Sequence, residues 1–114
     1  MAVAPKTYDP LTPAEFQVLV ALADGEKHGY AIGKEVARRT NGGVKLRAAT
    51  LYTVIKRLLA QGLIEESSAR PDPALDDERR RYYHLTERGH EVAVADARRL
   101  EQTLVQARAK LGLA

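Results

Sequence analysis

Residues 47–64 have the sequence RAATLYTVIKRLLAQGLI, and this stretch decides the fold. Four apolar side chains recur in it at helical spacing and predict one buried stripe, formed by Leu51, Ile55, Leu58 and Leu59. Gly62 stands where a residue in the left-handed conformation commonly ends a helix. We therefore expect a helix from about residue 47 to Gly62, with Leu63-Ile64 as the start of a strand behind it.

Two helices are predicted before this one. Thr12-Pro13-Ala14-Glu15 has the capping-box pattern with proline at the first helical position, and Asp24-Gly25 ends the helix that it begins. A second helix is expected from Tyr30 to Thr40, because Asn41-Gly42-Gly43 tolerates positive φ and breaks it. Beyond that break, Val44-Lys45-Leu46 alternates apolar and polar residues and predicts a very short strand.

A hairpin and a long helix are predicted downstream. Tyr82-Tyr83-His84-Leu85 predicts a strand that pairs with Leu63-Ile64, and the polar segment between them, which holds Pro71 and Pro73, predicts a long exposed loop. One tyrosine of this strand should face inward and the other outward. Thr86 is expected to cap a helix of about 25 residues that ends near Gly112.

This order of elements predicts a mainly α protein with a small β-hairpin, namely a winged helix-turn-helix followed by a long C-terminal helix. The expected organisation is a flexible N-terminal arm over residues 1–10, a winged helix-turn-helix over 11–85 and a C-terminal helix over 86–114.

The composition narrows the classes of protein to consider. The 114 residues fit one domain, and 29% charged against 45% hydrophobic residues is the balance of an ordinary folded protein. The absence of cysteine excludes disulfides and cysteine zinc sites. No apolar run is long enough to span a membrane and no export leader is visible, so we expect the cytoplasm. The net charge of +3 is compatible with nucleic acid but favours it only weakly.

Groups for catalysis or metal binding are sparse. The histidines His28, His84 and His90 form no paired helical motif, so no metal site is expected, and His28 should cap or pack at the start of the second helix. Glu65 and Glu66 are adjacent and should lie on opposite faces of a strand. With no nucleophile–base pair and no phosphate-binding glycine loop in the sequence, we expect neither an enzyme nor a cofactor.

A set of short motifs runs through the chain in a fixed order: Leu11-Thr12-Pro13, His28-Gly29-Tyr30, Thr50-Leu51-Tyr52, Arg57-Leu58, Gly62-Leu63-Ile64, Tyr82-Tyr83 and Leu85-Thr86-Glu87-Arg88-Gly89. Together they resemble the PadR-like transcriptional regulators, in the short form with a single C-terminal dimerisation helix. The resemblance covers residues 11–112, and it departs at Ala49, where the family often has glycine. It implies a DNA-binding regulator. Such regulators often repress a nearby gene and often respond to small molecules such as phenolic compounds or drugs.

The outer face of the third helix is the predicted DNA-reading surface. If the leucine and isoleucine stripe faces the core, the helical period places on the opposite face Ala49, Thr50, Thr53 and Arg57. Small and polar side chains let a helix lie deep in the major groove, and an arginine there can pair with guanine. Tyr52 and Lys56 should lie on the flanks, nearer to phosphate. The alternative is that Lys56 and Arg57 only keep an amphipathic helix soluble.

The loop of the hairpin carries a second set of cations, Arg70, Arg79, Arg80 and Arg81. Because successive strand residues alternate in direction, the three consecutive arginines cannot all point at DNA. We expect Arg79 and Arg81 to contact it, in the minor groove or at its phosphates. The alternative is a surface network in which nearby acids neutralise the arginines, namely Asp72, Asp76, Asp77 and Glu78.

The C-terminal helix carries an apolar stripe with coiled-coil spacing, formed by Ala93, Ala97, Leu100, Leu104, Ala107 and Leu111. We expect it to form the interface of a homodimer that binds a palindromic operator in double-stranded DNA, with a small-molecule effector as a further possible partner. The alternative is that the helix folds back on its own core, as Val92 and Val94 should do in part. The competing functional hypothesis is a winged-helix protein-interaction module without DNA binding.

Overall fold

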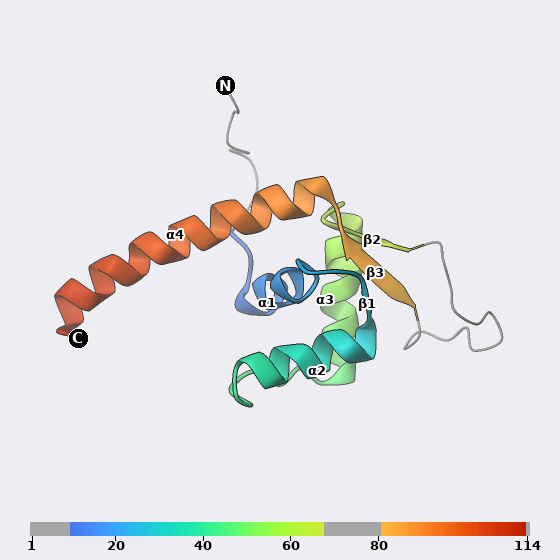
Figure 1. Cartoon of the computed structure of the whole chain (residues 1–114), viewed down its shortest axis with the longest axis horizontal. Helices are drawn as coiled ribbons and strands as arrows, with labels where there is room; N and C mark the ends of the chain where they lie inside the picture. Colours follow the sequence, from blue (N-terminus) through green and yellow to red (C-terminus); the bar gives the residue numbers. More distant parts are fainter. Residues whose placement is uncertain (1–9, 68–80, 114) are drawn as a thin grey trace, which may run out of the picture.

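The computed structural model describes residues 10–67 and 81–113. Along the chain, the elements in these ranges are α1 (Pro13–Ala21), β1 (Lys27–His28), α2 (Gly29–Arg39), α3 (Ala48–Ala60), β2 (Ile64–Glu66), β3 (Tyr82–Leu85) and α4 (Glu87–Leu111). Figure 1 shows α1, α2 and α3 grouped beside the small sheet, while α4 leaves this group and extends away from it. The mainly helical class and the winged helix-turn-helix order predicted from the sequence are confirmed.

The sheet has three antiparallel strands in the order β1-β3-β2. The predicted hairpin is present as β2 and β3, with Ile64 opposite Leu85. The predicted strand at Val44-Lys45-Leu46 is wrong, because Lys27–His28 forms the third strand instead. Val44 and Leu46 are half-buried against the core, so their alternation reflects packing before α3 rather than pairing in a sheet.

Side-chain caps fix where three of the helices begin. The predicted capping box is confirmed at α1, where Thr12 Oγ1 accepts from the amide of Glu15 and Glu15 Oε1 accepts from the amide of Thr12. His28 caps α2 as expected, because its Nδ1 accepts from the amide of Ala31 at 3.1 Å. Thr86 caps α4, where its Oγ1 accepts from the amide of Gly89 at 3.0 Å.

One core joins the three short helices, the sheet and the beginning of α4. Its largest fully buried side chains come from every one of these layers and include Leu19, Ile32, Ile55, Leu58, Ile64 and Val92. The stripe predicted on α3 is confirmed at Leu51, Ile55 and Leu58. Of the tyrosine pair in β3, Tyr83 is buried, whereas Tyr82 stays half-exposed and its ring lies perpendicular to the His28 ring. The core therefore supports α3 from behind and leaves its outer face open.

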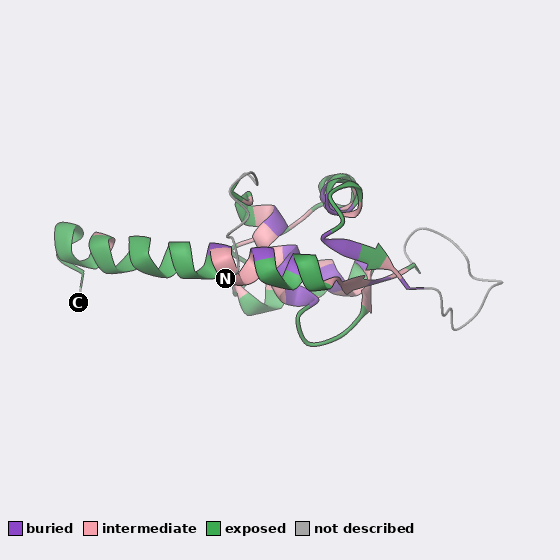
Figure 2. Ribbon diagram, turned by 90° about the horizontal axis from the view of Figure 1, so that it is seen from above, coloured by how far each residue is buried: buried purple, intermediate pink, exposed green. Residues whose placement is uncertain are grey.

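The helix α4 has two different halves. Its first half packs on the domain through Val92 and through Asp96, a buried carboxylate that pairs with Arg99 one turn further on. Its second half is almost entirely exposed, as Figure 2 shows, and it ends at Gly112 in the left-handed conformation. At about 1.5 Å per residue the helix is about 37 Å long, so it extends well beyond the domain that it caps.

Candidate nucleic-acid interface

The outer face of α3 is the surface that the sequence predicted. Leu51, Val54, Ile55 and Leu58 are buried on the inner side of the helix. The exposed residues on the other sides include the predicted set of Ala49, Thr50, Thr53, Lys56 and Arg57. A helix with small side chains outward at its centre and cations near its end has the shape required to enter a major groove.

The hydroxyl of Thr53 forms a hydrogen bond within α3. Its Oγ1 donates to the carbonyl oxygen of Ala49 one turn earlier, at 2.9 Å. Because the proton is used in this bond, the oxygen presents only lone pairs to a partner outside the helix. Thr53 can therefore accept a hydrogen bond from the amino group of adenine or cytosine, or offer its methyl to thymine.

Arg57 is tied to the beginning of α1. Its Nε lies 3.6 Å from Oε2 of Glu15, whose side chain is 7% exposed, while the arginine side chain is 53% exposed. Glu15 is also the acid of the capping box, so one carboxylate joins the start of α1 to the last turn of α3. The ion pair holds the guanidinium at the edge of the outer face rather than at its centre.

Tyr52, which the sequence predicted on the flank of α3 and near phosphate, packs against the protein instead. It is half-buried, and its ring covers Gly29 at the start of α2. A Cβ placed on Gly29 would lie 2.6 Å from the Tyr52 hydroxyl oxygen, so a side chain there would displace the ring. The contact joins the two motifs His28-Gly29-Tyr30 and Thr50-Leu51-Tyr52, and it sets how α2 and α3 approach each other.

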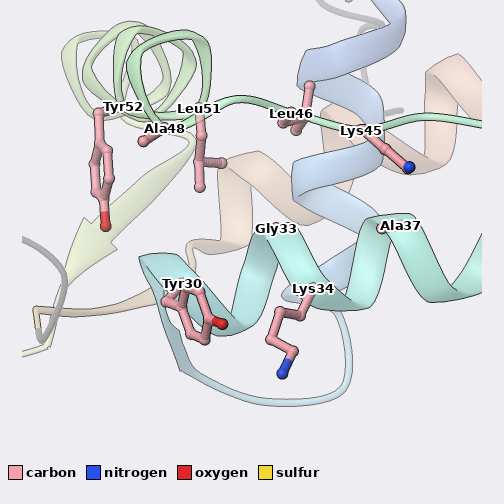
Figure 3. Close-up of a pocket in the computed structure, with 9 residues that line it drawn as sticks. All are labelled: Tyr30, Gly33, Lys34, Ala37, Lys45, Leu46, Ala48, Leu51 and Tyr52. Carbon is pink, nitrogen blue, oxygen red and sulfur yellow. The ribbon is translucent and has the colours of Figure 1, made fainter. Parts of the chain in front are cut away.

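Sequence reasoning missed three exposed cations near the start of α3. Lys45 and Arg47 directly precede the helix, and Lys34 on α2 lines the same hollow as Ala48 (Figure 3). The residue that begins α3, Arg47, contributes no side-chain cap, so the positive end of the helix is not covered by an acidic cap. A signal for Lys45 and Arg47 was visible in the sequence, because residues 36–64 contain six lysines and arginines and no aspartate or glutamate.

The base of the hairpin loop is held by a polar cluster. Ser67 Oγ donates to Oε1 of Glu26 at 2.7 Å and lies 3.1 Å from Nδ1 of His84. His84 Nε2 in turn lies 3.2 Å from Oε1 of Glu65. The serine proton goes to a carboxylate rather than to the histidine, so the cluster orders the loop base and does not present an activated nucleophile.

The predicted wing cations are only partly within the described residues. Arg81 is described, and its Nη1 lies 3.8 Å from Oε1 of Glu66, which is the kind of acidic neighbour that the alternative interpretation of the wing required. Arg70, Arg79 and Arg80 lie outside the described residues. Glu65 contacts His84 whereas Glu66 contacts Arg81, in keeping with their predicted positions on opposite faces.

The apolar stripe of α4 divides at the point where the helix leaves the domain. Ala93 packs against the core, so this residue is covered by its own chain. Beyond it, the leucines of the stripe are exposed by 44% at Leu100, 48% at Leu104 and 71% at Leu111. Val105 and Leu113 add further exposed apolar surface to this half. Such a continuous row on a projecting helix is unusual for a side that faces only water.

Within residues 10–67 and 81–113, no group of three or more histidine, aspartate or glutamate side chains is placed to hold a metal ion. The same residues contain no helix with the length and hydropathy needed to cross a bilayer.

Most of the chain matches one known protein family. Residues 18–95 match the family described as Transcriptional regulator PadR-like family. The matched range begins inside α1, contains α2, α3 and the whole sheet, and ends within the first half of α4. It therefore includes every residue of the predicted DNA-reading face and leaves out the projecting half of α4.

Solved structures from several organisms have the same fold. A transcriptional regulator from Clostridium thermocellum superimposes with a TM-score of 0.72 at 24% identity, over 84% of this chain and 87% of that one. A PadR family transcription regulator from Clostridium difficile gives 0.72 at 23% identity, over 88% and 99%. RosR of H. salinarum gives 0.63 at 29% identity, over 84% and 76%.

A curated relative adds sequence similarity over a shorter range. An uncharacterized protein of Lysinibacillus sphaericus, protein X, is 33% identical over 72 residues. The match spans 63% of this chain and 63% of that protein, which is less than two thirds of its length.

Proposed function

The chain belongs to the PadR-like family of transcriptional regulators, and on that premise we propose that it represses transcription by binding a palindromic operator as a homodimer. Its family is one of regulators rather than enzymes. The observation that carries the proposal is the outer face of α3, where small and polar side chains lie outward within a segment, residues 36–64, that has no carboxylate.

In this proposal α3 enters the major groove and the surrounding cations contact phosphates. Ala49, Thr50 and Thr53 meet base edges, because their short side chains allow close approach. Lys56 contacts phosphate, and Tyr52 does so only if its hydroxyl, which is buried beside Gly29, turns outward on binding. Arg57 contacts guanine from the end of the helix, which requires it to exchange its ion pair with Glu15 for the base. Arg79 and Arg81 on the wing complete the predicted contacts, in the adjacent minor groove.

The proposed dimer forms through the projecting half of α4. The exposed leucines recur with the spacing of a coiled-coil seam, and Ala97 and Ala107 between them let two helices approach closely. A two-fold axis through this seam would place two α3 helices on half-sites about one turn of DNA apart, which is why the operator is expected to be palindromic. Release by a small-molecule effector would follow if a ligand favoured a dimer with the wrong spacing.

A protein-interaction module without DNA binding is the competing function, and fluorescence anisotropy separates the two. A labelled duplex that carries the promoter of the chain's own gene is titrated with protein over a series of KCl concentrations. We expect tight binding that weakens with salt, with a log–log slope of about 0.9 for each phosphate contact. A scrambled duplex of equal length should bind about a thousandfold more weakly. Equal affinity for the two duplexes, or no binding at low salt, would refute the proposal.

A further inference from the structure

Glu15 brings a carboxylate against α3 from another part of the fold. It lies in the first turn of α1, and its side chain is only 7% exposed. Residues 36–64, which contain all of α3, have no aspartate or glutamate of their own. The acid beside the last turn of α3 is therefore supplied by α1, and its partner there is Arg57.

The two carboxylate oxygens of Glu15 have different partners. Oε1 accepts a hydrogen bond from the backbone amide of Thr12 at 2.9 Å, which holds the side chain at the start of α1. Oε2 lies 3.6 Å from Nε of Arg57, beyond hydrogen-bond length, so this contact is an attraction between charges without a hydrogen bond. The carboxylate is thus fixed in place, whereas the guanidinium is held by charge alone.

The Arg57 side chain can exchange this partner for another. It is 53% exposed, and it follows Thr53 by about one turn on the outer face of α3. In the major groove a guanine offers both O6 and N7 to one guanidinium, whereas adenine and thymine offer one acceptor each. We therefore expect the arginine to leave Glu15 for guanine and to stay beside it at other bases.

Departure of the guanidinium has a cost within the protein. The buried carboxylate keeps the amide of Thr12 but loses its cation, and an unpaired charge is unfavourable where water is excluded. Each contact of Arg57 with guanine therefore carries this cost, which disappears when residue 15 has no charge.

We propose that Glu15 is a positioning residue that acts through Arg57, because it holds the guanidinium at the edge of the outer face and thereby lowers the affinity for the operator. The inference deepens the proposed function and rests on it. Glu15 limits how tightly the operator is bound, while Arg57 carries the discrimination between bases.

A double-mutant cycle on operator affinity tests the proposal, since it isolates the part of the Glu15 effect that passes through Arg57. Glutamine keeps the shape of glutamate and an acceptor for the amide of Thr12, so Glu15→Gln removes the charge and preserves the cap. In anisotropy titrations we expect Glu15→Gln to bind the operator more tightly, by up to about fivefold, the upper limit for a pair with a half-exposed partner. In the Arg57→Ala background the same change should have no effect.

The guanine itself supplies a second readout. It is identified as the base pair whose replacement weakens binding by the parent protein but not by Arg57→Ala. On a duplex in which adenine replaces this guanine, Glu15→Gln should bind no more tightly than the parent protein, because the released arginine finds no pair of acceptors there.

Thr12→Ala is the matched control for the structure at the start of α1. It removes the hydroxyl half of the capping box but keeps the backbone amide of residue 12 and the ion pair. It should lower thermal stability without tightening operator binding. Glu15→Gln should lower thermal stability slightly and tighten binding, two opposite changes that a loosened α1 cannot produce.

Four results would contradict the inference. Unchanged or weaker operator binding by Glu15→Gln overturns it, and weaker binding would mean that Glu15 steadies Arg57 for its contact instead. An equal gain in the Arg57→Ala background overturns it too, because the carboxylate would then repel DNA directly. An equal gain with Thr12→Ala would assign the effect to a looser α1. If the parent protein binds no duplex better than a scrambled one, the proposed function fails and this inference fails with it.

Discussion

The α-carbon of Gly89 in α4 lies directly against the backbone carbonyl of Leu63, so close that a Cβ on Gly89 would overlap the carbonyl oxygen. Two hydrogen bonds reinforce this contact. The Thr86 amide donates to the Leu63 carbonyl at 3.1 Å, and Thr86 Oγ1 donates to the Gly62 carbonyl at 2.7 Å. The motif Leu85-Thr86-Glu87-Arg88-Gly89 therefore fastens the start of α4 to the turn between α3 and β2.

The change Gly89→Ala should be strongly destabilising. The added methyl meets backbone rather than a movable side chain, so α4 must shift away from the turn, at a cost of about 3 kcal/mol or more. Urea unfolding followed by circular dichroism measures it. Gly33→Ala on α2 is the matched control, because a Cβ there would lie 3.4 Å from Leu51 Cδ2 and alanine favours a helix by about 0.5–1 kcal/mol. Equal effects of the two changes would contradict this account of the α4 contact.

The hydroxyl of Thr86 should contribute more to the stability of the protein than its methyl group does. Thr86→Ala removes both the cap of α4 and the bond to Gly62, and we expect a loss of about 1–3 kcal/mol in the free energy of unfolding. Thr86→Ser keeps the oxygen and should restore most of that loss. If serine destabilised the protein as much as alanine, the two hydrogen bonds could not be the cause.

The ion pair of Glu15 and Arg57 allows the structural role of the arginine to be separated from its proposed role in reading DNA. Arg57→Ala should relax discrimination at a guanine of the operator by about 1–3 kcal/mol. Glu15→Gln breaks the same ion pair but leaves the guanidinium in place, so discrimination should persist. Because the arginine is half-exposed, loss of the pair should lower stability by at most about 1 kcal/mol. Anisotropy with operator variants measures the first effect and thermal unfolding measures the second.

Lys56 should contribute to affinity without contributing to sequence preference. Lys56→Ala should weaken binding to every duplex alike and reduce the salt slope by about 0.9 for each phosphate contact removed. Arg98→Ala, which removes an exposed cation from the middle of α4, is the control and should leave the slope unchanged. A change in preference among operator variants on mutation of Lys56 would mean that this side chain contacts bases.

The seam of α4 should depend on Leu104. Leu104→Glu places a charge in the proposed interface, and burying it unpaired costs several kcal/mol, so we expect monomers at concentrations where the parent protein is dimeric. Sedimentation velocity measures the association. Gln102→Glu introduces the same charge at an exposed position of α4 outside the predicted stripe and should leave the dimer intact. Dissociation by both changes, or by neither, would show that the interface lies elsewhere.

Local signals in the sequence predicted most of the elements. Thr12 and Glu15 formed the expected capping box, and the period of Leu51, Ile55 and Leu58 correctly gave the buried side of α3. Gly62 has the expected positive φ, of 73°. These features depend on neighbours within a turn or two, which is why composition and spacing alone could reveal them.

Contacts between distant segments could not be predicted in this way. The strand β1 has only two residues and exists because Lys27 and His28 pair with Tyr83 and Tyr82, so it has no period of its own. The ion pair from Glu15 to Arg57 crosses from one helix to another. A charged residue in a long helix suggests a surface position, yet Asp96 is 1% exposed because α1 and the domain cover that side of α4.

The backbone contact at Gly89 also determines how motion could pass through the proposed dimer. Because no side chain lies between α4 and the turn after α3 at this contact, the start of α4 has little freedom to shift relative to the domain. The domain and α4 therefore move together as one rigid unit. A tilt of α4 by about 10° at the seam would move the other end of the helix, about 37 Å away, by about 6 Å. That is close to two base-pair steps of DNA at 3.4 Å each. A small change in the angle between the two α4 helices at the seam would therefore become a large change in the distance between the two α3 helices of the proposed dimer.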